Sequence, residues 1–129
     1  MILVDTSVWI NYFNGLSNRE TEILDEILST EIVIIGDLIL MELLQGFRID
    51  KEYKQALSLL DTLEKQSLLN ADSAIEYANM YRSLRKKGIT IRKTTDTIIA
   101  GYCVLNDLSL LQSDRDFQPF KKHFGLKLV

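Results

Sequence analysis

The sequence is poor in residues that form disulfides, sharp turns or histidine-based sites. Its 129 residues include one cysteine, one proline and one histidine. The lone cysteine, Cys103, has no partner within the chain for a disulfide, a bond that is typical of oxidising compartments. We therefore expect a protein of the reducing cytoplasm.

Long hydrophobic runs are also missing. Apolar runs such as Leu38–Met41 are short, and that one ends at Glu42, whereas a membrane-spanning helix needs about 18 or more apolar residues. The first residues, MILVD, carry no basic side chain before Asp5, unlike a secretory signal peptide. These absences predict a cytoplasmic protein with no membrane association.

Several catalytic devices are excluded in the same way. The single histidine, His123, lies outside any Ser-His-Asp pattern, and the glycines are isolated rather than gathered in a phosphate-binding loop. Cys103 occupies the apolar face of a predicted helix, where a thiol is inert. Any chemistry must therefore come from carboxylates, hydroxyls and a bound metal.

What the sequence does have is the composition of one globular domain spanning residues 1–129, with 47% hydrophobic and 26% charged residues. Short apolar runs alternate with stretches of helical periodicity, which predicts an α/β fold: a three-layer α/β/α sandwich around a parallel sheet. The predicted strands are residues 2–4, 32–35, 108–111 and 126–129, with a weaker candidate at 67–69.

Helices are predicted between these strands, with polar residues near their starts. They cover about 18–29, 38–47, a stretch with apolar positions from 74 to 84, and a stretch from residue 96 onward. Asp37 is a candidate cap for the second. Asn70 or Asp72 is a candidate for the third, and Thr94 or Thr95 for the last.

The net charge of −3 hides an uneven distribution. Residues 1–64 carry a net −8, whereas residues 65–129 carry +5. No acid lies between Glu76 and Asp96, a segment that contains six basic residues. A polyanion would be attracted to that segment, although a solvated helix end followed by a loop explains the same charges. The basic residues are Arg82, Arg85, Lys86, Lys87, Arg92 and Lys93.

Four acids are predicted to approach one edge of the sheet. Asp5 directly follows the first strand and Asp114 a late one, while Asp96 begins a helix and Glu42 lies one turn into another. In open α/β sheets, ligands bind outside the carboxyl ends of the strands. Four carboxylates about 6 Å apart would repel by roughly 3 kcal/mol per pair. Such a cluster therefore needs protons, basic partners or a hard cation such as Mg²⁺ or Mn²⁺.

Four motifs along the whole chain resemble those of PIN-domain ribonucleases, specifically the VapC-type toxins of toxin–antitoxin pairs. The motifs are VDTSVWI (residues 4–10), ELLQGF (42–47), TDTIIA (95–100) and LLQSDRDF (110–117). The resemblance implies an endoribonuclease that depends on Mg²⁺ or Mn²⁺. Metal-activated water would attack the phosphorus and leave a 5′-phosphate and a 3′-hydroxyl.

The resemblance also implies roles for individual residues. Asp5 and Asp96 would be the main metal ligands, and Glu42 would bind a second metal or orient the attacking water. Asp114 and the accessory Asp116 would add ligands directly or through water. Thr6 and Ser7 would form hydrogen bonds within the site. One departure is Gln112, which stands where close relatives often carry histidine.

Partners follow from the same resemblance: RNA as substrate (transfer or ribosomal), a VapB-type antitoxin that covers the site, a homodimer, and a higher-order complex with the antitoxin. Arg82, Arg85, Arg92 and Lys93 are candidate RNA contacts, with Arg92 favoured because it precedes the Asp96 helix. Two other classes that use an aspartate after the first strand, haloacid-dehalogenase-like phosphatases and phosphorelay receivers, fit worse. The non-enzymatic alternative is an RNA- or protein-binding module whose acids only cap helices.

Overall fold

The computed structural model describes all 129 residues and contains one parallel sheet of five strands. The strands lie in the order β3-β2-β1-β4-β5, and every neighbouring pair is parallel. This confirms the predicted α/β class with a central parallel sheet. The strands are β1 Ile2–Val4, β2 Val33–Gly36, β3 Glu64–Gln66, β4 Ser109–Leu111 and β5 Lys127–Leu128.

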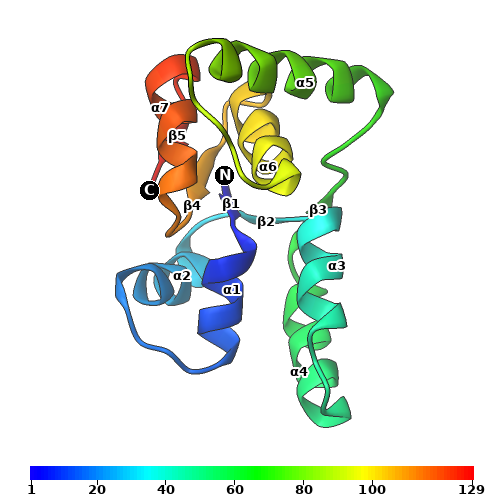
Figure 1. The fold of residues 1–129 in the computed structure, drawn as a ribbon. Coiled ribbons are helices and arrows are strands. Elements are labelled where there is room, and N and C mark those ends of the chain that lie inside the picture. Colours follow the sequence, from blue (N-terminus) through cyan, green and yellow to red (C-terminus); the bar gives the residue numbers. More distant parts are fainter.

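Helices cover both faces of the sheet, as the sandwich prediction requires. Figure 1 shows α5 and α6 on one side and α1 and α2 on the other, with the α3–α4 pair extending away from the sheet. The helices are α1 Thr6–Phe13, α2 Arg19–Thr30, α3 Asp37–Gln45, α4 Asp50–Leu60, α5 Ala71–Lys86, α6 Thr94–Leu105 and α7 Gln118–Phe124, with a short 3₁₀ helix η1 at Arg115–Phe117. None of these helices is long and apolar enough to span a bilayer.

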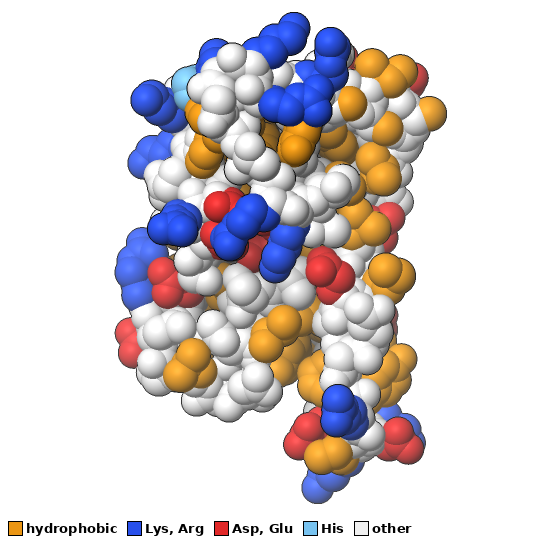
Figure 2. Space-filling model, viewed as in Figure 1, with side chains coloured by type: hydrophobic (Ala, Val, Ile, Leu, Met, Phe, Trp, Pro, Cys, Tyr) orange, Lys and Arg blue, Asp and Glu red, His pale blue; other side chains and the backbone are white.

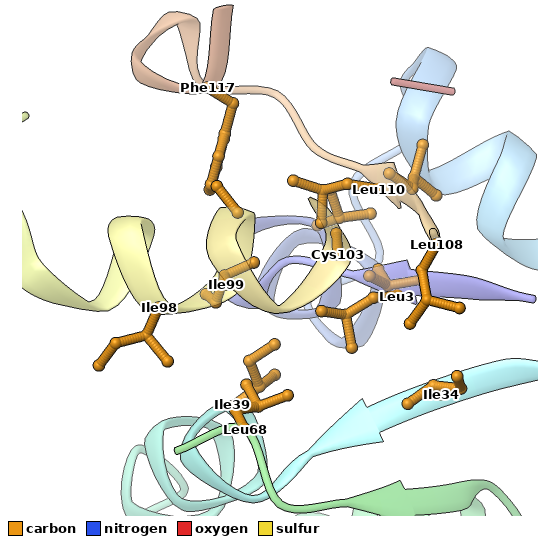
Figure 3. Close-up of a cluster of buried hydrophobic side chains, with 14 of the residues drawn as sticks. Leu3, Ile34, Ile39, Leu68, Ile98, Ile99, Cys103, Leu108, Leu110 and Phe117 are labelled. Carbon is orange, nitrogen blue, oxygen red and sulfur yellow. The ribbon is translucent and has the colours of Figure 1, made fainter. Parts of the chain in front are cut away.

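The main core lies where α6 packs against the middle of the sheet (Figure 3). Leu3 and Leu110 come from adjacent strands, and Ile99 and Cys103 face them from α6; all four side chains are at most 1% exposed. Strands buried on both faces consist largely of apolar residues, which is why the runs at 2–4 and 108–111 could be recognised although the second contains Ser109. This packing fixes α6 over the strands that carry the site.

The strand order reverses between β1 and β4. From β1 the chain moves outward to β2 and β3 on one side, and later returns to β4 and β5 on the other. Val4 pairs with Leu111 across this junction, and the backbone N–H of Asp5 donates to the Leu111 carbonyl at 2.9 Å. Such a switch point is where open α/β sheets bind their ligands.

The weak strand candidate at 67–69 was wrong, since the edge strand is Glu64–Gln66. Leu68 is buried, but it lies in the following loop, where its N–H donates to Asp37 Oδ1 at 3.1 Å. The sequence signal at Leu68 was therefore burial beneath the α3 start rather than strand pairing. The helices α1, α4 and α7 were not among the predicted helices.

The candidate caps had different outcomes. Asn70 caps α5, since its side chain accepts from the Ser73 N–H at 2.9 Å. Asp37 is the first residue of α3 rather than its cap, and Gly36 takes the cap position. Neither Thr94 nor Thr95 caps α6: both lie inside the helix, and the cap residue is Lys93, which makes no side-chain cap bond.

Candidate metal centre

Asp5 is positioned by the end of β1, in the cap position of α1, and only 6% of its surface is exposed. The Ser7 hydroxyl donates to Asp5 Oδ2 at 2.7 Å. Burial raises the pKa of the Asp5 carboxyl, an effect that the Ser7 hydrogen bond opposes. Ser7 thus orients one carboxylate oxygen of Asp5 and favours its ionised form.

Glu42 lies on α3, and its carboxylate turns toward the start of α1. The Thr6 hydroxyl donates to Glu42 Oε1 at 3.1 Å, across 36 residues of sequence. Glu42 is half-buried rather than enclosed in the apolar core. The two neighbouring hydroxyls, Thr6 and Ser7, therefore hold one carboxylate each.

Three aspartates form the tightest acidic group of the chain. Carboxylate oxygens of Asp96, Asp114 and Asp116 lie within 4.8 Å of one another. Asp96 belongs to the first turn of α6, whereas Asp114 follows β4 and Asp116 belongs to η1. The tertiary fold thus brings residues about 20 positions apart in sequence into one potential ligand set.

Of these three aspartates, Asp96 is the one whose negative charge is most disfavoured by its surroundings. It is 7% exposed, its Oδ2 is fully buried without a hydrogen-bond partner, and its pKa is raised from 3.8 to about 6. Burial is the largest cause, followed by the negative charges of Asp5 and Asp114. Asp5 lies outside the 4.8 Å group but acts on Asp96 through its charge, and Glu42 acts on Asp5 in the same way.

Asp114 and Asp116 are held by different partners. Asp114 caps η1, since its Oδ1 accepts from the backbone N–H of Asp116 at 2.9 Å. The Asp116 side chain instead accepts from Arg92 Nε at 2.8 Å. Asp116 therefore caps no helix: Asp114 caps η1, Phe117 takes the cap position of α7, and the Asp116 carboxylate lies near those of Asp96 and Asp114.

The predicted RNA contacts divide into two places. Arg92 and Lys93 lie beside the acids, and Figure 2 shows basic side chains directly over the acidic patch near the centre of this face. Arg82 lines a hollow of about 380 Å³ together with Thr94 and Thr97 of α6. Arg85 lies over the ring of Tyr81, 5.7 Å from its centre.

Sequence reasoning missed Ser113 as part of the site. Its hydroxyl lies 3.3 Å from the Ser7 hydroxyl, so it extends the hydrogen-bonded chain that begins at Asp5. Its place one residue before Asp114, two residues after the end of β4, was the available signal. Gln112, the departure from the related toxins, has a buried Oε1 with no hydrogen-bond partner.

The residues present fit a hard divalent cation. The available donors are carboxylate and hydroxyl oxygens, which Mg²⁺ and Mn²⁺ prefer, and no histidine or thiol is among them. The unpartnered Asp96 Oδ2 requires a cation or a proton, since a buried, unsatisfied charged oxygen is costly. A divalent cation held by Asp96, Asp114 and Asp116 would supply the positive charge that the unpartnered Asp96 oxygen lacks.

Comparison with protein families agrees with this geometry. The model of the family described as "PIN domain" matches residues 2–122. Among curated proteins, the chain is 32% identical over 132 residues to Ribonuclease VapC11 of Mycobacterium tuberculosis, covering 98% of this chain and 96% of that protein. It is 29% identical over 127 residues to Ribonuclease VapC1 of Methanocaldococcus jannaschii, covering 98% and 85%.

Solved structures share the fold at lower identity. A chain in the crystal structure of VapBC2 from Rickettsia felis, bound to a DNA fragment of its promoter, superposes with a TM-score of 0.77 at 21% identity, covering 100% of this chain and 98% of that one. A chain of DNA-bound VapBC from Salmonella typhimurium gives 0.76 at 18% identity, covering 99% and 96%.

Proposed function

The chain belongs to the PIN-domain family and, within it, to the VapC ribonuclease toxins of toxin–antitoxin systems, and we propose that it is an endoribonuclease that depends on Mg²⁺ or Mn²⁺. The observation that carries the metal dependence is the Asp96–Asp114–Asp116 group, in which one buried carboxylate oxygen has no partner. A binding module that uses acids only as helix caps would not need such an oxygen.

The proposed ligands are Asp5, Asp96, Asp114 and Asp116. When bound, the metal supplies a Lewis acid that activates water and stabilises negative charge on the phosphodiester. Asp5 is included because it lies at the end of the central strand and its charge acts on Asp96. Glu42 orients the attacking water or takes part in a second metal site, and Thr6 fixes its carboxylate.

The surface above these acids supports a polyanionic substrate. Lys93 is the cap residue of the helix that carries Asp96, and its positive charge lowers the pKa of that carboxyl. Arg82 lies near the same helix start and Arg85 one turn further along α5. We propose that these bases contact RNA phosphates, which explains how a chain of net charge −3 can bind RNA. Transfer or ribosomal RNA is the proposed substrate class.

Cleavage of purified total RNA tests the proposal directly. The folded protein, free of antitoxin, is incubated with Mg²⁺ or Mn²⁺, with chelator, and as the Asp96→Asn variant. The matched control is Asp72→Asn, which removes an exposed acid from the first turn of α5. We expect discrete fragments from the wild type and from the control, and none with chelator or with Asp96→Asn. Equal cleavage by Asp96→Asn would refute the assigned site.

The proposed protein partner is an antitoxin of the VapB type. A groove of about 620 Å³ between α1, α3 and α4 supports this, since its lining includes Phe13, Phe47 and exposed Ile49, and Glu42 of the site contributes to it. An antitoxin segment in this groove would reach the acids and inhibit the enzyme. Co-purification of the chain with a co-expressed VapB-type antitoxin tests the contact, with Phe47→Asp as the disrupting variant.

We propose a homodimer as the free form, and a higher-order complex when the antitoxin is bound. Hydrophobic side chains gather over α5 in Figure 2. Ile75 and Leu69 are 63% and 43% exposed, and a hollow lined mainly by apolar side chains lies between α5 and α6. Light scattering on the purified chain should give a dimer mass, and Ile75→Lys should shift it toward the monomer.

A further inference from the structure

Arg92 places its guanidinium on the acids that the proposed metal would need. Its Nε donates to Asp116 Oδ2 at 2.8 Å, and its Nη2 lies 3.8 Å from Asp114 Oδ1. No other side chain donates a hydrogen bond to Asp116, and Arg92 is the only base within ion-pair distance of either acid. In the metal-free protein, the Arg92 guanidinium therefore pairs with two of the three carboxylates, those of Asp114 and Asp116.

The Arg92 side chain is exposed enough to move away from the acids. Ile91 is 4% exposed and anchors the loop before α6, whereas the Arg92 side chain is 63% exposed. The guanidinium can therefore swing into solvent by rotation of its own side chain, while the buried neighbour keeps the backbone in place. Asp114 stays fixed through its bond to the Asp116 N–H, which does not involve Arg92.

We propose that Arg92 is an internal counter-ion for the acidic group, which a divalent cation displaces when it binds; this inference rests on the proposed function. The Asp116 oxygen that accepts from Arg92 cannot at the same time be a full ligand of a metal. A dipositive ion beside the guanidinium would also repel the guanidinium. Arg92 therefore stabilises the metal-free site and weakens metal binding. Its donors become available to RNA only after the metal has arrived.

Metal affinity measured by titration calorimetry tests the displacement. We expect Arg92→Gln to bind Mn²⁺ on the order of tenfold more tightly than the wild type, because no bond has to be broken first. The matched control is Lys93→Gln, which removes the same charge from the adjacent residue. Lys93 acts on Asp96 through its field but makes no ion pair with the acids. A purely electrostatic effect would strengthen binding equally in both variants, and that result would overturn the proposal.

NMR spectroscopy can follow the hydrogen bond between Arg92 and Asp116 directly. The Nε–H resonance of Arg92, identified by its absence in Arg92→Gln, should exchange slowly with water in metal-free protein and become fast-exchanging when Mg²⁺ saturates the site. A resonance that stays protected in saturating Mg²⁺ would overturn the displacement, as would unchanged or weaker Mn²⁺ binding by Arg92→Gln. If the wild type binds no Mn²⁺ at all, the metal-dependent function fails, and the counter-ion inference fails with it.

Discussion

Replacing Asp96 with asparagine should stabilise the metal-free protein, although the residue is proposed to be essential for activity. The carboxyl is buried, its side chain accepts no hydrogen bond, and its pKa lies at about 6 instead of 3.8. One pKa unit corresponds to about 1.4 kcal/mol. Keeping Asp96 ionised above pH 7 therefore costs about 3 kcal/mol of folding free energy.

The sign follows from proton linkage. Because the folded-state pKa is raised, the folded protein holds a proton that the unfolded chain has lost between about pH 4 and 6, and stability falls as the pH rises through that window. Asparagine carries no charge and does not incur this loss. The advantage of Asp96→Asn should thus be about 3 kcal/mol at pH 7.5 and only about 1 kcal/mol at pH 4.5.

Urea unfolding in chelator at the two pH values measures these differences. The control is Asp107→Asn, an exposed position with a positive φ of 55° that asparagine tolerates and a surface ion pair to Lys127. That variant should change stability by less than about 1 kcal/mol, with little pH dependence. Added Mn²⁺ should stabilise the wild type but not Asp96→Asn. If Asp96→Asn were less stable than the wild type at pH 7.5, the account of Asp96 as a strained carboxylate would be refuted.

Three further predictions concern the scaffold. Asn70→Ala removes the side chain that accepts from Ser73 and should lower the free energy of unfolding by about 1 kcal/mol in urea titrations; no change would mean that the cap does not stabilise α5. Gly101→Ala places a methyl group against the Tyr77 ring and should cost about 1–3 kcal/mol; a neutral variant would show that α5 and α6 separate freely. Burial raises the pKa of Cys103 to about 12, so native protein should resist iodoacetamide at pH 8 until urea is added.

Much of the sheet could be predicted because strands buried on both faces appear in the sequence as short apolar runs. The runs at 2–4 and 108–111 became β1 and β4 within one residue, and their central positions in the sheet explain why all their residues but Ser109 are apolar. The edge strand β3 has the sequence EKQ and is largely exposed. An exposed edge strand contains no such apolar run, so the nearby buried residue Leu68 was mistaken for part of the strand.

The acids of the site were predictable for a related reason. Asp5 and Asp114 follow strands, and Asp96 lies in the first turn of a helix whose apolar face could be read from its spacing. The carboxyl ends of neighbouring parallel strands meet at one edge, so these residues had to converge if the strands were parallel. Which acids would form the tightest group was not predictable. Asp116, predicted only as an accessory ligand, belongs to it, and Asp5, predicted as a main ligand, does not.

By itself, then, the sequence determined the α/β class and the strand ends that carry acids, because periodicity and burial act locally along the chain. Only the tertiary structure decided that Arg92 lies on Asp116, that Thr6 bonds to Glu42, and that Ser113 joins Ser7. These contacts join loops and helix ends far apart in sequence. Their distances depend on how α6 packs over the sheet, which no local pattern of residues records.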